Sequence, residues 1–156
     1  MIVIEIPGWK TLRLEHLVLD YNGTLACDGD LLTGVRSRLD DLAKQVQIHV
    51  LTADTFGKAH AALNGIQCQL CVLPAGHQDA GKLNYVQKIG GDNTACIGNG
   101  RNDRLMLKAA ALGVLIVGNE GAATDTLMVS DVVAPNIVAA LDLLLHPLRL
   151  IATLRC

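Results

Sequence analysis

The sequence predicts a Rossmann-like, three-layer α/β/α sandwich built around a mostly parallel sheet. Two observations indicate this fold class. Short continuous apolar runs alternate with segments of helical period along the chain, which is the pattern of repeated strand–helix units. Aromatic residues make up 3% of the chain although 51% of it is hydrophobic, so the core must consist of aliphatic side chains, as in sheets that helices cover on both faces.

The first part of the chain predicts two hairpins and one buried strand. Residues 2–6 and 11–15 flank Pro7-Gly8 and predict a leading hairpin. The apolar run at 16–19 predicts the first strand of the main sheet, which ends at Asp20. The Asp-Gly pair at 28–29 predicts a small flap hairpin over residues 25–32.

Strands and helices then alternate. We expect strands at residues 47–51, 67–73, 94–97, 114–117 and 131–134. Helices are expected at residues 35–45, 56–63, 79–89 and 102–112, followed by a last helix that starts near Asn136 and is broken at Pro147. The leucine-rich stretch 141–154 would cover an exposed edge or form a homo-oligomer contact. No linker or low-complexity run interrupts the 156 residues, so we expect one domain spanning 1–156.

Composition argues against several classes of function. The net charge is −2 with acids and bases mixed throughout, so there is no basic stripe for general nucleic-acid binding. The apolar runs are shorter than the roughly 20 residues that span a bilayer, and the start of the chain lacks the features of a secretion signal. We therefore expect no membrane span and a cytoplasmic location. The five cysteines are an odd number and lie mostly in apolar runs, as expected of reduced, packed thiols.

Polar residues follow several of the predicted strands. Asp20 ends the first strand, Thr52 follows the second, and the segment 98–103 follows the fourth, while Lys82 opens the preceding helix. Ligands of open α/β sheets bind outside the carboxyl ends of the strands. The sequence therefore predicts an anion-and-metal site at that edge of the sheet.

Four motifs in this order resemble the haloacid dehalogenase-like superfamily, and within it the phosphorylation domain of P-type ATPases. Asp20-Tyr-Asn-Gly-Thr-Leu25 is similar to Asp-Lys-Thr-Gly-Thr-Leu of those pumps, and Leu51-Thr-Ala-Asp54 to Leu-Thr-Gly-Asp. Lys82 matches the third motif, and Gly98-Asn-Gly-Arg-Asn-Asp103 resembles Gly-Asp-Gly-Val-Asn-Asp. The resemblance runs from about residue 16 to about residue 145, and residues 118–121 match a loop that borders the site in the family, although a plain turn explains them equally well.

The resemblance implies a phosphatase that works through an aspartyl phosphate. Asp20 would be the nucleophile that accepts the phosphoryl group. Thr52, Ala53, Gly23 and Lys82 would bind the phosphoryl oxygens and stabilise the charge that develops on them.

The resemblance also implies Mg²⁺ as the cofactor. Asp20, the backbone carbonyl of Asn22 and the side chain of Asn99 would hold the ion. Asp103 would belong to the same metal site and, together with Asn102, would orient the ligands from outside the inner shell.

Two amides stand where the family has acids. Phosphatases of the superfamily carry a second Asp at the position of Asn22, where it donates and accepts the proton of catalysis. P-type ATPases lack that acid, and their aspartyl phosphate persists. Asn99 replaces a carboxylate ligand of the metal. We therefore expect slow hydrolysis and weaker binding of Mg²⁺.

The spacing of the motifs leaves no room for a cap domain or an ATP-binding domain, because the predicted elements use up residues 25–51 and 55–81. An open site would accept a phosphorylated small molecule or a phosphorylated macromolecule. The leading hypothesis is a slow, magnesium-dependent phosphohydrolase. The alternative is a non-catalytic or regulatory binding module on a degenerate fold, and a dehalogenase ranks below both because the fourth motif is of the magnesium type.

Overall fold

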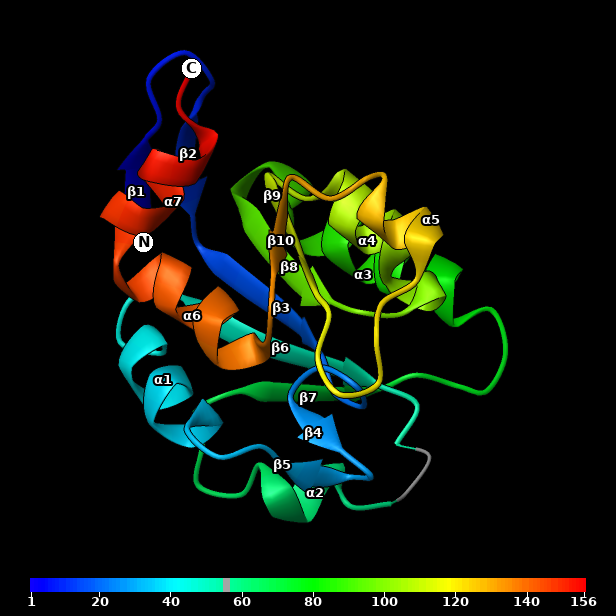
Figure 1. The fold of residues 1–156 in the computed structure, drawn as a ribbon. Helices are drawn as coiled ribbons and strands as arrows, with labels where there is room; N and C mark the ends of the chain where they lie inside the picture. Colours follow the sequence, from blue (N-terminus) through cyan, green and yellow to red (C-terminus); the bar gives the residue numbers. More distant parts are fainter. Residues whose placement is uncertain (55–56) are drawn as a thin grey trace.

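The computed structural model describes residues 1–54 and 57–156, and its centre is a six-stranded sheet in which every neighbouring pair is parallel (Figure 1). The strand order is β10-β9-β8-β3-β6-β7. The strands are β3 (His16–Asp20), β6 (Gln47–Thr52), β7 (Gln69–Val72), β8 (Thr94–Gly98), β9 (Leu112–Ile116) and β10 (Val132–Ala134). The parallel pairing of all neighbours confirms the predicted parallel sheet, and the order places β3 between β8 and β6.

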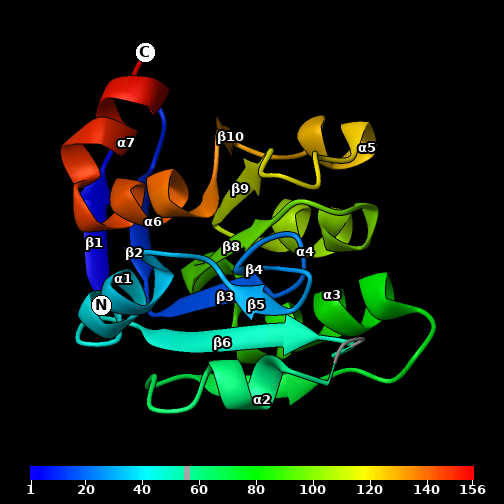
Figure 2. The same cartoon turned by 60° about the horizontal axis from the view of Figure 1, so that its bottom comes forward.

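Helices cover both faces of this sheet (Figures 1 and 2). On one face lie α1 (Val35–Leu42), α6 (Ile137–Leu145) and the short α2 (Ala59–Ala62), whose apolar residues join one large core cluster. On the other lie α3 (Gln78–Ile89), α4 (Arg104–Ala109) and α5 (Thr124–Leu127), with 3-10 turns η1 (Gly91–Asn93) and η2 (Arg101–Asp103) beside them. The three-layer sandwich is therefore confirmed.

The central strand shows why its sequence is continuously apolar. Leu17 and Leu19 belong to the large cluster on the side of α1 and α6. Val18, between them, belongs to the smaller cluster beneath α3 and α4. Successive side chains of a strand point to opposite faces, so a strand covered on both faces needs an apolar residue at every position.

Both predicted hairpins are present. The leading hairpin pairs β1 (Ile2–Glu5) with β2 (Thr11–Leu14), and the flap pairs β4 (Ala26–Cys27) with β5 (Asp30–Leu31). The buried Tyr21 hydroxyl donates to the carbonyl of Gly29, 2.9 Å away, and so ties the tip of the flap to the loop after β3.

A final helix, α7 (Pro147–Leu154), packs against the leading hairpin (Figure 1). Its Leu150 is fully buried, and the amide of Cys156 donates to the carbonyl of Pro7 at 3.2 Å. The C-terminal stretch thus covers an apolar edge, as the first of the two sequence interpretations predicts.

Several predicted boundaries were wrong. The helix predicted at 35–45 ends at Leu42, and the strand predicted at 67–73 is shorter at both ends. The helix predicted at 102–112 ends at Ala109, because Ala110 turns to extended backbone (φ −80°, ψ 156°) and Leu112 already begins β9. Of the helix predicted at 56–63, residue 56 lies outside the described residues and α2 covers only 59–62. Helix α5 was not predicted, and Pro147 starts a new helix as well as ending the previous one.

All five cysteines are free thiols, of which Cys96 is buried and Cys156 exposed. Within the described parts of the chain, no single helix is both long and apolar enough to cross a membrane. Helices α6 and α7 approach that length only as a pair, and they are bent by 100° relative to each other.

Candidate active site

Asp20 lies at the carboxyl end of the central strand, where the resemblance places the nucleophile. Its side chain is 9% exposed. One carboxylate oxygen, Oδ1, accepts from the Lys82 ammonium at 2.6 Å, and the other, Oδ2, accepts from the Thr24 hydroxyl at 3.0 Å. The carboxylate is therefore fixed from two sides by groups that come from different segments.

Lys82 projects from α3, and only 1% of its surface is exposed. Besides Asp20 it donates to Oδ1 of Asp103, also at 2.6 Å, so one ammonium bridges two carboxylates. Burial lowers the pKa of Lys82, but the charges of Asp103 and Asp20 outweigh burial and hold that pKa above its ordinary value. The lysine is therefore charged. An ammonium has three N–H donors, and these two bonds leave one for an incoming oxygen.

Asp103 organises the loop after β8. It is fully buried, and its Oδ2 accepts from the amides of Asn99 at 3.0 Å and Gly100 at 2.8 Å. A Cβ on Gly98 would lie 2.5 Å from the Asp103 carboxyl carbon, so only glycine allows this close approach. Asp103 thus contacts both Lys82 and the loop after β8, and its place in the predicted metal site stays a prediction.

The side chain of Asn99 is oriented from both ends. Its Nδ2 donates to the carbonyl of Gly121 at 3.1 Å, and its Oδ1 accepts from the Thr24 hydroxyl at 3.3 Å. Since that hydroxyl also faces Oδ2 of Asp20, a carboxylate oxygen and an amide oxygen come together beside one residue. Oxygens grouped in this way are the ligands that a small divalent cation prefers.

The loop after β3 contributes two further features. The Asn22 side-chain oxygen is buried and has no hydrogen-bond partner, although buried polar atoms rarely lack one. Gly23 has φ +81°, and a Cβ there would lie 2.7 and 2.8 Å from the Asn99 amide atoms and 2.8 Å from Oε2 of Glu120. The space above Gly23 is thus a small cradle bordered by the Asn99 amide and the Glu120 carboxylate.

These features fit a divalent cation. Within residues 1–54 and 57–156, no three His, Cys, Asp or Glu side chains form a metal cluster. The oxygens here come instead from one strand-end carboxylate, amide side chains and backbone. Mg²⁺ keeps several waters and needs only one or two protein carboxylates, so such a mixed set is sufficient.

Burial and the neighbouring negative charge of Asp103 raise the pKa of Asp20 from 3.8 to about 7. The ammonium of Lys82 and the hydroxyl of Thr24 oppose this shift without cancelling it. The raised pKa favours the protonated form of Asp20, and a further positive charge nearby would favour the ionised form.

The other residues predicted for the site lie near Asp20 in the fold but form hydrogen bonds elsewhere. Thr52 is buried at the end of β6, adjacent to β3, and its hydroxyl accepts from the amide of Asp54 at 2.9 Å; no hydrogen bond joins it to Asp20 in the described residues. Ala53 follows in the same turn. The Asn102 amide donates to Gln78 at 3.0 Å, so it ties η2 to the start of α3 outside the centre of the site.

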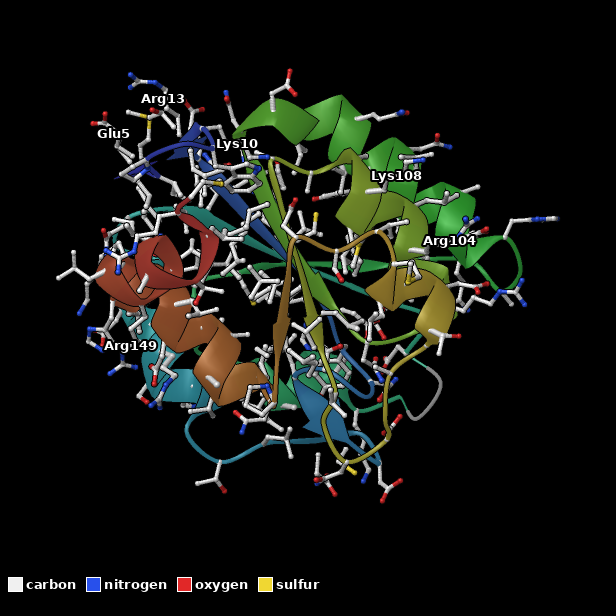
Figure 3. All side chains as sticks on the ribbon, turned by 45° about the horizontal axis from the view of Figure 1, so that its top comes forward. Glu5, Lys10, Arg13, Arg104, Lys108 and Arg149 are labelled. Carbon is white, nitrogen blue, oxygen red and sulfur yellow. The ribbon has the colours of Figure 1, made fainter. Side chains whose placement is uncertain are left out.

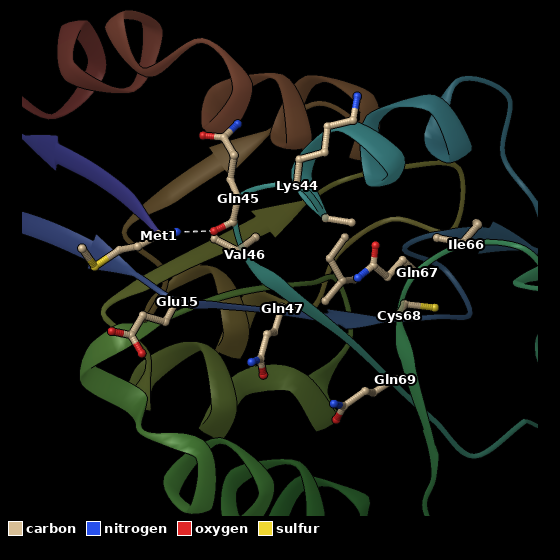
Figure 4. A pocket seen from close by; sticks show the side chains of 12 residues that line it. Met1, Glu15, Lys44, Gln45, Val46, Gln47, Ile66, Gln67, Cys68 and Gln69 are labelled. Atoms are coloured by element: carbon tan, nitrogen blue, oxygen red, sulfur yellow. Dashed lines mark hydrogen bonds between the residues drawn. The ribbon is translucent and has the colours of Figure 1, made fainter.

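Hollows occur at both ends of the sheet. The larger, about 590 Å³, lies at the amino ends of β3, β6 and β7 and is lined by residues such as Glu15, Gln47 and Gln69 (Figure 4). It is at the edge opposite to Asp20, where parallel sheets do not place their chemistry. A second, about 310 Å³, adjoins Gly23 and Glu120. Sequence reasoning singled out the loop 118–121 but not Glu120 itself, because an exposed loop carboxylate carries no signal of its own.

The sheet and the arrangement at its carboxyl edge define a haloacid dehalogenase-like fold without a cap domain. Solved structures with this fold cover most of the chain. One is the 3-deoxy-D-manno-octulosonate 8-phosphate phosphatase of Moraxella catarrhalis, in complex with magnesium, phosphate and the sugar acid, with TM-score 0.72 and 14% identity over 90% of this chain and 93% of that one. Another is the cobalt-bound octulosonate 8-phosphate phosphatase of Haemophilus influenzae, with TM-score 0.65 and 15% identity over 86% and 88% of the two chains. A third is the phosphatase BT1666 of Bacteroides thetaiotaomicron, from the same superfamily, with TM-score 0.61 and 12% identity over 85% and 94%. At these identities the likeness shows the fold.

The chain belongs to the same family as the uncharacterized protein MJ0073 of Methanocaldococcus jannaschii. The two are 43% identical over 84 residues, which is 51% of this chain and 90% of MJ0073. The uncharacterized protein MJ0072 of the same organism is 46% identical over 39 residues, or 25% of this chain and 89% of that protein. No protein-family model matches the sequence.

Proposed function

We propose that this protein is a slow, Mg²⁺-dependent phosphohydrolase that transfers the phosphoryl group of a phosphate ester to Asp20 and then to water. One observation carries the proposal. The Asp20 carboxylate stands at the carboxyl end of the central strand, bound by a buried ammonium on one oxygen and a hydroxyl on the other. A purely structural carboxylate does not require a lysine to be buried from a different layer of the fold, because burying a charge is costly.

In the first step an oxygen of Asp20 attacks phosphorus and the bond from phosphorus to the ester oxygen breaks. The alcohol leaves as an alkoxide that takes a proton from water. In the second step water attacks the same phosphorus, the aspartyl bond breaks, and inorganic phosphate and the free carboxylate are released. The free N–H of Lys82 stabilises the charge on the phosphoryl oxygens in both steps.

Asp20, Asn99 and the backbone of Asn22 would hold Mg²⁺, which supplies positive charge to the phosphoryl oxygens. That same charge would favour the ionised form of Asp20, whose pKa is raised in its absence. Two solved structures of this fold, which contain magnesium or cobalt, support the choice of a divalent cation.

Hydrolysis is slow because the chain lacks the usual acid. Asn22 cannot exchange a proton at neutral pH, and loss of a positioned general acid or base costs about 10² to 10⁴ in rate. The aspartyl phosphate should therefore accumulate, as the motif resemblance to P-type ATPases also implies. The substrate is a phosphorylated small molecule or macromolecule, since the chain between β3 and β6 forms only the flap and α1.

The test uses p-nitrophenyl phosphate and acetyl phosphate with Mg²⁺. The wild type should release phosphate slowly and should acquire an acid-stable, hydroxylamine-sensitive phosphoryl label, and EDTA should abolish both. Asp20→Asn should abolish both as well, whereas Asp92→Asn, which removes an exposed acid elsewhere, should change neither. Equal labelling of wild type and Asp20→Asn would refute the proposal.

The second candidate is a non-catalytic or regulatory binding module, and the two amides favour it. Asn22 and Asn99 each stand where phosphatases of the superfamily have a carboxylate. The double variant Asn22→Asp/Asn99→Asp separates the candidates. If it hydrolyses phosphate esters and the wild type neither hydrolyses them nor becomes labelled, the module is correct.

A further inference from the structure

We propose that Glu120 supplies the negative charge that Asn99 does not, so that this glutamate, Asn99 and Asp20 together hold a divalent cation above Gly23. The inference rests on the proposed function, because it concerns the same site. It adds a carboxylate from a different loop, which none of the four motifs contains.

Oε2 of Glu120 and Oδ1 of Asn99 each lie 2.8 Å from the point where a Cβ of Gly23 would stand, and Nδ2 of Asn99 lies 2.7 Å from it. The Glu120 carboxylate and the Asn99 amide therefore border the same small volume, which the missing side chain of Gly23 leaves open. The φ of +81° at Gly23 is a conformation that L-residues with side chains rarely adopt, so the loop favours glycine for two reasons.

The loop that carries Glu120 is bonded to the site. The carbonyl of Gly121 accepts from Asn99 Nδ2 at 3.1 Å, and the amide of Ala123 donates to the backbone carbonyl of Asn99 at 2.9 Å. A Cβ on Gly118 would lie 3.4 Å from the carbonyl oxygen of Gly23. Loop 118–123 is thus bonded to Asn99 and packed against Gly23, and it does not project freely into solvent.

The charge of Glu120 also favours a cation at this position. Among the described residues, no Lys, Arg or His forms an ion pair with Glu120, and its carboxylate makes no hydrogen bond. Glu120 is exposed, so in the described structure a cation can approach its carboxylate without displacing a partner.

Glu120 thus supplies the negative charge of the acid that is missing at position 99. A site with Asp20 and Asn99 alone would offer one carboxylate to the ion. With Glu120 it offers two, as in typical Mg²⁺ sites, and the total charge of the family site is restored from another loop.

The experiment measures binding of Mn²⁺ to the metal-free protein by the EPR signal of free Mn²⁺, without substrate. Glu120→Gln should raise the dissociation constant about tenfold or more. Glu5→Gln is the matched control, because it removes the same charge from the exposed face of the leading hairpin, far from this edge of the sheet (Figure 3). It should bind like the wild type. Far-UV circular dichroism and thermal unfolding show that each variant is folded.

A charge-relocation variant completes the test. In Glu120→Gln/Asn99→Asp the carboxylate moves back to position 99, and affinity for Mn²⁺ should return to the wild-type value or better. If Glu120→Gln binds like Glu5→Gln while Asp20→Asn loses binding, the role of Glu120 is refuted and the proposed function stands. If the double variant binds as weakly as Glu120→Gln, the idea of relocated charge is refuted. Absence of Mn²⁺ binding by the wild type would refute the metal site altogether, whereas phosphoryl labelling of Asp20 tests the nucleophile separately.

Discussion

Lys82 and Asp20 form a buried ion pair in which the ammonium nitrogen lies 2.6 Å from a carboxylate oxygen. The same nitrogen lies 2.6 Å from Asp103, which is itself fully buried. Three ionisable groups from α3, β3 and η2 thus contact one another at the carboxyl edge of the sheet, and the proposed chemistry depends on these contacts.

Lys82→Met should remove both activity and stability. The substitution leaves Asp20 and Asp103 buried without a cation, and breaking a buried pair costs about 3–5 kcal/mol of unfolding free energy. Phosphoryl labelling should fall below detection. Urea unfolding and the labelling assay measure the two effects. Lys88→Met, an exposed position on the same helix, is the control and should change neither.

Thr24→Val should weaken binding of Mn²⁺ while Thr24→Ser retains it. Valine keeps the shape of threonine but removes the hydroxyl that donates to Asp20 at 3.0 Å and to Asn99 at 3.3 Å. Without that shared donor the two oxygens are no longer held side by side, and we expect a loss of about 10-fold or more in affinity. Equal affinities of the two variants would show that the hydroxyl does not orient the ligands.

Gly23→Ala should abolish binding of Mn²⁺ and phosphoryl labelling. Its methyl group would enter the cradle formed by Asn99 and Glu120, at distances that real Cβ atoms do not show. Gly76→Ala is a matched control, because Gly76 has a similar φ of +86° and a Cβ there meets nothing within 4 Å. Both variants should lose about 1 kcal/mol or more from backbone strain, measured by urea unfolding, but only Gly23→Ala should lose function.

His49 should make stability fall in acid. It is buried between His16 at 3.1 Å and the Tyr85 hydroxyl at 3.0 Å, with Gln69 also facing it. Burial, and then the charge of His16, lowers the pKa of His49 below 6.5. The unfolded chain therefore takes up a proton before the folded chain does, so this contribution to stability is present above pH 6.5 and is lost as the pH falls towards the lowered pKa.

The variant His49→Gln should remove that dependence. Between pH 7 and pH 5 the unfolding free energy of the wild type should fall more steeply than that of His49→Gln, by no more than about 1.4 kcal/mol per pH unit for one proton. Urea unfolding at several pH values gives both slopes. His60→Gln, at an exposed position, should keep the wild-type slope. Parallel slopes for the wild type and His49→Gln would contradict the prediction.

The sequence predicted which residues meet at the site better than it predicted the hydrogen bonds that they form. Asp20, Lys82, Asn99 and Asp103 meet because parallel strands bring their carboxyl ends to one edge, a rule that follows from the common direction of the strands alone. The roles given to these residues remain predictions. Thr52 reaches the expected strand end, but its hydroxyl bonds to the local amide of Asp54. A short polar side chain can bond either to its own turn or to a distant group, and sequence pattern does not distinguish the two.

Element boundaries and the extra helix were harder to predict for a related reason. Leu112 fits the apolar period of the preceding helix as well as the start of β9, and only tertiary packing decides between them. Helix α5 is four residues long and partly exposed, so it carries too little periodic signal. Glu120 was also missed by sequence reasoning. Its proposed role depends on the space above Gly23, which exists only once both loops are folded.

Because the six strands run in one direction, their carboxyl ends and their amino ends lie at opposite edges of the sheet. The residues of the proposed chemistry lie at the carboxyl edge, whereas the leading hairpin and α7 lie near the amino end of β3 and pack on one another. Sequence drift among descendants of this protein should therefore concentrate at the hairpin and α7, and new attachments or partners can evolve there without disturbing the loops that hold Asp20.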